Sequence, residues 1–424
     1  MKTKRLILLV LCAVFSSTIF AQKKDVPVAV SSISSEEIQP FSQGTWRYDL
    51  KQVLGGEFGS EKVNGEKSEN YINGNLDIEA DYFVIDNLAV GARIYRDCYR
   101  SKDIGDDISR DAETQFFVNV AYGQQFNNFN LMGKVSAGIG KYNYKYKAGG
   151  GSEYTSEYSE NLFDLKASVI SPIKVDNNFF LSPEIGYQFS SCKEGDWKYT
   201  ESGVFLGLNL DLFFRCDDYF CDIGNDFSRP ADRYRQSTTV IGSRTNFYLN
   251  TGTAKDTYPG EMGEEMEDKY GFTNSGLSAN GYYYVIDNVA VGLGLGFNIS
   301  NEKQKDYDYN YNSWYFDIMP KAMVNLPVDD KALRNLFLDA GIGFGTQQRK
   351  IEDMAEEATT NYSRLSYTVG IGYNYFITGK SCITPYINYN GLSRKDKTND
   401  VKRAWSGLGL GIAWNVHLPA QQVR

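Results

Sequence analysis

The chain has 424 residues, of which 53 are acidic and 44 basic, so its formal net charge is −9. An acidic chain whose charges are scattered in short segments lacks the clustered basic surface of a nucleic-acid-binding protein, and we exclude nucleic acid as a partner. After the N-terminus, no segment is apolar over the roughly 18 residues that a transmembrane helix requires. A helical membrane protein is therefore excluded as well.

The N-terminus has the pattern of a cleaved secretory signal. Basic residues among the first five precede an apolar run over 6–15, and small and polar residues lead to Ala21. This order predicts a signal peptide over 1–21, removed after Ala21, followed by a polar segment over 22–43. Removing the signal leaves 41 basic residues against 53 acidic ones, a net charge of −12.

The rest of the chain alternates between apolar and polar residues with a period of two, which is the signal of strands. The alternation is clear over 74–84, 204–214 and 408–418, and we expect its apolar members, including Leu208, Leu210, Leu212, Trp414 and Val416, to face lipid. One face is apolar over about ten residues, the length of a tilted membrane-crossing strand. The pattern predicts an all-β protein, an antiparallel transmembrane β-barrel.

Sixteen such segments follow one another, eight in each half of the chain. They lie near 45–58, 72–84, 88–97, 114–126, 130–142, 162–174, 179–190 and 203–214, and near 238–250, 275–285, 289–300, 313–325, 336–346, 364–376, 382–392 and 406–418. Tight polar turns alternate with longer tyrosine-rich segments near 59–70, 96–113, 142–160 and 190–201. We expect these longer segments to be extracellular loops.

The two halves share sequence. Phe-Val-Ile-Asp-Asn-Leu-Ala-Val-Gly at 83–91 returns at 284–292 with tyrosine first and one leucine replaced by valine, and Ala-Gly-Ile-Gly at 137–140 returns at 340–343. Repeats of this length set the architecture. They predict a first β-barrel repeat over 44–214, a linker over 215–235, a second repeat over 236–418 and a tail over 419–424. In the linker, Cys216 and Cys221 either form a local disulfide or stay as thiols, because spacing alone does not fix their geometry.

A tyrosine-ended strand, a Val-Ile-Asp-Asn turn and a Leu-Ala-Val-Gly strand start resemble the small outer-membrane β-barrel family, the OmpX-like or porin-family domains. The resemblance covers 44–214 and 236–418. It implies eight strands per copy and localisation in the cell outer membrane. It also implies outer-membrane lipid as a partner, and the barrel-assembly machinery during insertion, while any partner of the loops stays unknown.

The two repeats can close together or separately. Strand duplication is a simple route to one barrel of about 16 strands, wide enough for an aqueous channel, and we predict this form. The long linker and the aromatic end of the eighth segment, Phe213-Phe214, favour the alternative of two tandem eight-stranded barrels filled by their own side chains.

Charged residues on the inward face of the first half are the candidate site. They are Glu79, Asp81, Arg93, Lys134, Lys166 and Glu184. They either line a selective pore or pair with one another in a closed interior. His417 is the only histidine and has no partner motif, so we predict neither an enzyme nor a metal or cofactor site. We expect porin-like passive diffusion of small hydrophilic solutes; the alternative is a non-conducting structural or adhesive barrel acting through its extracellular loops.

Overall fold

The computed structural model describes residues 39–49, 54–126, 129–149, 154–176, 178–215, 234–242, 246–259, 265–304, 309–327, 333–353, 356–376 and 381–418. The predicted signal peptide, most of the polar segment, most of the linker, including Cys216 and Cys221, and the tail lie outside them. The strands are β1 (Thr45–Asp49), β2 (Leu54–Val63), β3 (Glu66–Ile85), β4 (Leu88–Asp103), β5 (Ile108–Gln125), β6 (Asn130–Lys147), β7 (Thr155–Ile170), β8 (Ile173–Asp176), β9 (Phe179–Glu194), β10 (Trp197–Arg215), β11 (Thr239–Gly242), β12 (Asn246–Pro259), β13 (Glu265–Ile286), β14 (Val289–Gln304), β15 (Tyr309–Asn325), β16 (Leu336–Asp353), β17 (Glu356–Tyr373), β18 (Tyr375–Phe376), β19 (Ser381–Asp396) and β20 (Lys402–Leu418). Among the described residues, no helix has the length and hydrophobicity needed to cross a bilayer.

These segments form a closed antiparallel barrel of 16 strands, and the predicted fold class is confirmed. The segments outnumber the barrel strands because four strands are each divided in two, as β1/β2, β7/β8, β11/β12 and β17/β18. Strands that follow one another in the chain are neighbours in the wall, and β2 closes the ring against β20, where Phe58 lies opposite Leu408. Closure leaves no free sheet edge, as a barrel in a membrane requires.

One end of the barrel is forked, because β10 changes its partner along its length. Over most of its length β10 pairs with β12, as far as Leu208 opposite Phe247. From Asp211 onward it pairs with β1 instead, and Asp211 lies opposite Asp49. Only Asn209 and the residue after it separate the two pairings. The ring that contains β10 therefore differs between the two ends of the strand.

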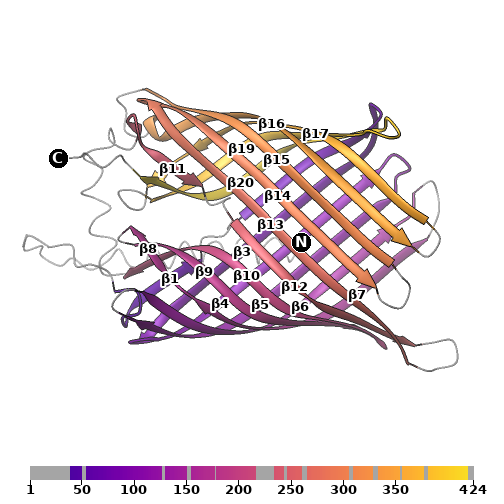
Figure 1. The fold of residues 1–424 in the computed structure, drawn as a ribbon, viewed down its shortest axis with the longest axis horizontal. Coiled ribbons are helices and arrows are strands. Elements are labelled where there is room, and N and C mark those ends of the chain that lie inside the picture. The colour runs from indigo at the N-terminus through magenta and orange to yellow at the C-terminus, as the bar shows by residue number, and fades with distance from the viewer. Residues whose placement is uncertain are drawn as a thin grey trace, which may run out of the picture. The chain divides into compact units, whose positions relative to one another are not determined.

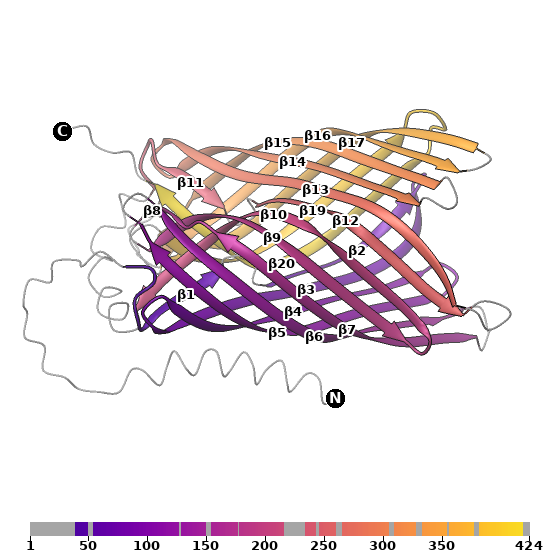
Figure 2. The ribbon, with the colours of Figure 1, turned by 60° about the horizontal axis from the view of Figure 1, so that its bottom comes forward.

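β20 makes the same exchange. It pairs with β2 as far as Ile412, opposite Leu54, and with β11 from Asn415, opposite Gly242. At this end each half closes on itself into an eight-stranded ring. We call these rings the first leg (β1 with the adjacent parts of β3–β10) and the second leg (β11 with the adjacent parts of β13–β20). Figures 1 and 2 show the forked end at left and the common barrel to its right. The predicted barrel of 16 strands is therefore present over most of the wall. At the forked end, the wall divides into two eight-stranded rings, which is the arrangement of the alternative prediction.

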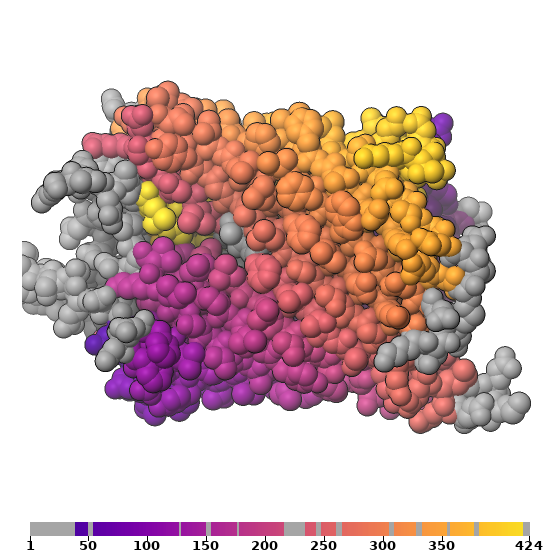
Figure 3. Space-filling view, in the orientation of Figure 1, coloured from indigo at the N-terminus to yellow at the C-terminus, as the bar shows by residue number. Residues whose placement is uncertain are grey.

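An apolar seam joins the legs. Phe179 and Leu212 of the first leg and Val416 of the second are at most 3 % exposed. Leu210 and Trp414 pack against them. The expectation that Leu210, Leu212, Trp414 and Val416 face lipid is therefore wrong, because the outward faces of the two legs meet each other here. Beyond the seam, the two halves are in continuous contact across the middle of the barrel (Figure 3).

Away from the fork, the alternation separates the two faces of the wall as predicted. Val118 and Ile139 point outward and are 64 % and 68 % exposed, whereas their neighbours Asn119 and Gly138 point inward. Leu208 is only half-buried and borders the interior cavity near the exchange of partners, so it is not a simple lipid-facing residue.

The segments expected to be long extracellular loops are mostly strand. β3 and β4 pair as far as Glu69 opposite Asp103, and β6 and β7 as far as Lys147 opposite Thr155. The loop predictions over 59–70, 96–113, 142–160 and 190–201 are therefore wrong. Polar residues in alternation can continue a hydrogen-bonded ladder into water, since the backbone bonds do not depend on an apolar face. The barrel wall extends past its apolar band in this way.

Candidate functional site

The repeated Val-Ile-Asp-Asn motif forms a tight turn at the forked end of each leg. In the first leg, the Asp86 carboxylate accepts a hydrogen bond of 2.8 Å from the backbone N–H of Gln43. The backbone N–H of Asn87 donates to the carbonyl of Phe41 at 2.7 Å. Asn87 has a φ of 70°, a left-handed conformation that asparagine adopts more readily than most residues. The motif thus anchors the chain that places Phe41 inside the leg.

The second leg repeats this arrangement. The Asp287 carboxylate accepts a bond of 2.8 Å from the backbone N–H of Gln236, and the N–H of Asn288 donates to the carbonyl of Tyr234 at 2.8 Å. Asn288 has a φ of 65°. We call Phe41 and Tyr234 the stoppers, since each enters its leg from the segment that precedes the leg's first strand.

Aromatic side chains fill the first leg around its stopper. The Phe213 ring lies 4.8 Å from that of Phe180, 6.2 Å from that of Phe41 and 6.5 Å from that of Phe83, measured between ring centroids. Phe83 and Phe213 are fully buried. Met132 and other apolar residues complete the same cluster. These aromatic and apolar side chains form a packed layer that closes this end of the leg.

A charged layer lies next to the apolar layer and centres on Arg47. Its guanidinium is fully buried and donates to Asp81 at 2.7 Å and to Glu79 at 3.1 Å. Its second terminal nitrogen lies 2.9 Å from a carboxylate oxygen of Asp211. On the other side of Glu79, the ammonium of Lys134 lies at 2.5 Å. Buried charges are tolerated when they pair in this way, and here they fill the width of the leg.

In the second leg, the buried tyrosines form neutral hydrogen bonds, and Tyr282 donates to Asp339 beside the remaining cavity. The Tyr234 hydroxyl donates to Asn335 at 3.0 Å, and the Tyr284 hydroxyl donates to Asn325 at 2.5 Å. The buried ring of His417 packs edge-on against Tyr234 at 5.7 Å between centroids. A cavity of about 90 Å³ remains in this leg.

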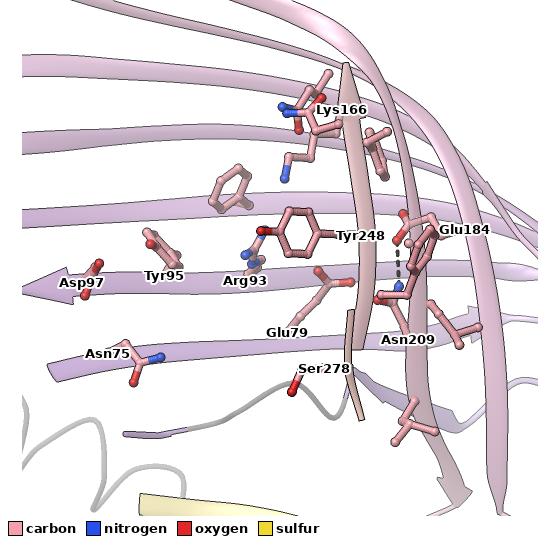
Figure 4. A pocket seen from close by; sticks show the side chains of 18 of the residues that line it. Asn75, Glu79, Arg93, Tyr95, Asp97, Lys166, Glu184, Asn209, Tyr248 and Ser278 are labelled. Carbon is pink, nitrogen blue, oxygen red and sulfur yellow. Dashed lines mark hydrogen bonds between the residues drawn. The ribbon is translucent and has the colours of Figure 1, made fainter. Parts of the chain in front are cut away.

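A larger cavity of about 990 Å³ lies above the first leg, inside the common barrel. Both halves of the chain line it; Arg93, Tyr95 and Lys166 come from the first half, and Tyr248 and Ser278 from the second. Figure 4 shows these side chains around the cavity. The charged layer of the first leg forms one boundary, since Glu79 and Lys134 also line the cavity.

All six lumen charges predicted from the sequence lie on the inward face. Glu79, Asp81 and Lys134 belong to the charged layer of the first leg. Arg93 binds Asp77 through two hydrogen bonds of 2.6 and 2.7 Å in the cavity wall.

The other two predicted charges lie farther along the wall. Lys166 lies over the ring of Phe205, with 5.9 Å from Nζ to the centroid. Glu184 accepts a hydrogen bond of 2.7 Å from the Asn209 amide, which Figure 4 marks. The six residues therefore split between a closed layer and an open cavity.

Sequence reasoning did not single out Arg47, although it has the most charged neighbours in the first leg. The sequence does indicate that Arg47 faces inward, because it lies between Trp46 and Tyr48, two outward aromatic residues. Asp49 and Asp211 follow from the same alternation.

The described residues offer no cluster of three histidine, cysteine or acidic side chains that could hold a metal ion. Cys98, Cys192 and Cys382 form no disulfide with another described residue. His417 lies in the second leg between aromatic rings, Phe376 at 5.0 Å being the nearer.

Comparison with known families identifies one match. Residues 237–414 match the outer membrane protein beta-barrel domain. These residues include the second leg and its continuation into the common barrel. A comparison with curated proteins finds no match.

Several solved structures of membrane barrels align with most of the chain at low similarity. The beta domain of the Bordetella autotransporter BrkA is 10 % identical with a TM-score of 0.29, over 88 % of this chain and 98 % of that one. The CymD monoaromatic hydrocarbon channel is 10 % identical with a TM-score of 0.28, over 90 % of each chain. OccK5 (OpdH) of Pseudomonas aeruginosa is 8 % identical with a TM-score of 0.29, over 90 % and 100 %. Similarity at this level carries no argument about activity.

Proposed function

We propose that this chain, whose residues 237–414 match the outer membrane protein beta-barrel domain, is a non-conducting outer-membrane barrel of structural or adhesive function. The family indicates localisation in the outer membrane. We place the forked end toward the periplasm, because the extended polar strands at the opposite end correspond to the larger exterior parts of such barrels. The exterior part then consists of strand hairpins that stand beyond the membrane.

The filled interior of both legs carries this proposal. In the first leg, the Phe41 stopper, the Phe213 layer and the Arg47 layer follow one another, and their side chains are at most 7 % exposed. In the second leg, Tyr234 and Tyr284 are at most 1 % exposed. Eight-stranded barrels are narrow enough to be filled by side chains, so a solute that enters the common barrel meets two closed exits.

Porin-like diffusion of small hydrophilic solutes is the second candidate. The 16-strand ring has the width of an aqueous channel, and the 990 Å³ cavity with its charged wall would admit small polar solutes. This function needs a path through one leg, which the packing of the described side chains opposes.

Electrical recording in a planar bilayer separates the two candidates. Folded wild-type protein is expected to show no stable conductance step, because neither leg offers ions a continuous aqueous path. A shift in gel migration on boiling verifies that the sample is folded. Stable steps from the folded protein would support the porin candidate and refute the proposal.

A variant without stoppers, Phe41→Ala with Tyr234→Ala, tests which layer seals the legs. It keeps the charged layer around Arg47 and the remaining hydrogen bonds of the second leg, such as that of Tyr284. We expect it to stay silent as well. Conductance in this variant alone would show that the stoppers seal the legs and that the inner layers do not.

A further inference from the structure

A mostly basic row of residues crosses the outward face of the first half, just beyond the apolar band. The six residues of this row lie directly opposite one another on successive strands from β4 to β10: Arg96, Thr114, Lys141, Asn161, Lys193 and Lys198. Four of the six are basic and none is acidic. Lys141, Lys193 and Lys198 are exposed.

A second basic row lies farther from the band. Arg100, Arg110 and Lys145 are directly opposite one another on β4, β5 and β6. Among the described residues, Lys145 alone of these three forms an ion pair, with Glu157 at 2.5 Å. Like charges directly opposite each other on neighbouring strands repel, so these rows cost stability unless something neutralises them.

The acidic residues of this region lie on the other side of the wall. Asp97, Glu113 and Glu160 occupy inward positions at the same level, next to the outward cations. Within the described residues, none of the cations of the two rows other than Lys145 forms an ion pair with an acidic side chain. A chain with a net charge of −9 thus presents a basic outward face over β4–β10. We call the basic residues of the two rows the cationic face.

The cationic face sits at the depth of lipid headgroups. The last apolar row, Ile94, Phe116, Ile139 and Phe163, lies two residues before the first basic row on the same strands. Two residues of strand span about 7 Å. Phe116 and Ile139 are more than half exposed, as lipid-facing residues are in the absence of lipid. The first basic row therefore lies about 7 Å beyond the apolar band, at the depth where we expect the phosphates of lipid headgroups.

The second half differs at three positions. Three of its outward lysines at the same end are paired with acidic residues, Lys255 with Glu267, Lys350 with Glu357 at 2.9 Å, and Lys395 with Asp400 at 2.6 Å. Lys402, directly opposite Lys395, forms no ion pair with a described acidic side chain. The three pairs are already neutralised within the chain. Outward lysines at this level of the wall can thus be neutralised by acidic residues on the same face, as these three are.

We propose that the cationic face binds the phosphate-bearing headgroups of anionic lipids in the outer leaflet. Lys and Arg are the side chains that bind phosphate, Arg through paired hydrogen bonds and Lys as a compact charge. Several cations arranged side by side bind an anionic membrane surface more strongly than scattered ones. The face thereby fixes one sector of the barrel to phosphorylated lipid, whether or not the barrel conducts.

Lipid retention on the full chain tests this proposal. Protein is reconstituted in phosphatidylcholine vesicles containing phosphatidylglycerol, extracted, and its bound lipids are counted by native mass spectrometry. The variant Lys141→Gln, Lys193→Gln, Lys198→Gln is expected to retain phosphatidylglycerol roughly tenfold less than the wild type. The matched control, Lys255→Gln, Lys350→Gln, Lys395→Gln, loses the same charge at paired positions and is expected to retain it unchanged.

Two further arms make the result specific. Replacing the same three lysines of the cationic face with arginine keeps the charge and is expected to keep the lipid, which separates loss of charge from misfolding. Added inorganic phosphate is expected to leave the retained lipid in place. Equal lipid loss in the two glutamine variants, or displacement by phosphate alone, would overturn the proposal.

Discussion

Replacing Arg47 with methionine is expected to destabilise the folded barrel by about 3–5 kcal/mol, the cost of removing one partner from a buried ion cluster. The guanidinium lies between Glu79, Asp81 and Asp211, and all of these side chains are at most 4 % exposed. Without it, these carboxylates face one another with no cation between them except Lys134, which contacts only Glu79. Equilibrium unfolding in urea, from protein folded in lipid vesicles, measures the change.

Arg100→Met is the matched control for this experiment. Arg100 is exposed on the outward face, and in vesicles of phosphatidylcholine alone, which offer no anionic lipid to the cationic face, its replacement is expected to change the free energy of unfolding by about 0.5 kcal/mol or less. Equal losses at positions 47 and 100 would mean that the charged layer contributes nothing specific to stability.

Replacing Phe213 with alanine is expected to cost about 3–5 kcal/mol, as for other fully buried phenylalanines. The Phe213 ring contacts Phe41, Phe83 and Phe180 inside the first leg, where no lipid or water can fill the space that it leaves. The same unfolding measurement reports the loss.

The control is Phe116→Ala on the lipid-facing side of the wall. Phe116 is 54 % exposed, and lipid chains can occupy the volume of its ring. We expect a clearly smaller loss than at position 213. A loss at position 116 as large as that at 213 would show that the leg interior is not packed as the structure describes.

The strands and the faces of the wall were predictable because both depend on local alternation. Val118 beside Asn119, or Ile139 beside Gly138, is enough to orient a strand once an apolar band is recognised. The outer parts of the strands were not predictable in this way. In β6, tyrosines alternate with Lys141 and Lys145, and both faces are polar enough to read as a loop.

The fork could not be predicted, because alternation says nothing about which strand lies alongside. The stretch 206–208 pairs with β12, and the stretch 211–214, with similar leucine alternation, pairs with β1. The partners are set by contacts between residues far apart in the chain. For the same reason, alternation alone predicted that Leu212 faces lipid, whereas in the structure it lies in the seam between the legs.

The candidate site was predictable residue by residue but not as a set of layers. The inward charges were recognised, yet their separation into a closed layer and an open cavity depends on where the legs close. Arg47 illustrates the difference between the repeats. The equivalent register position in the second leg, opposite Tyr282 and His417, is Val240, so no cation occupies this position of the second leg. One repeat does not predict the interior of the other.

Cross-linking of two residue pairs in one molecule tests the forked barrel most directly. In a chain whose native cysteines are replaced by serine, Tyr48→Cys with Leu212→Cys probes the pairing of β1 with β10, and Val204→Cys with Thr251→Cys probes that of β10 with β12. Residues directly opposite on antiparallel strands are about 4.5–5.5 Å apart between Cα atoms, within reach of a disulfide. The forked barrel predicts that both disulfides form in the same folded molecule. A disulfide between 204 and 251 alone would indicate an unforked barrel, one between 48 and 212 alone would indicate two separate barrels, and either result would contradict the structure described here.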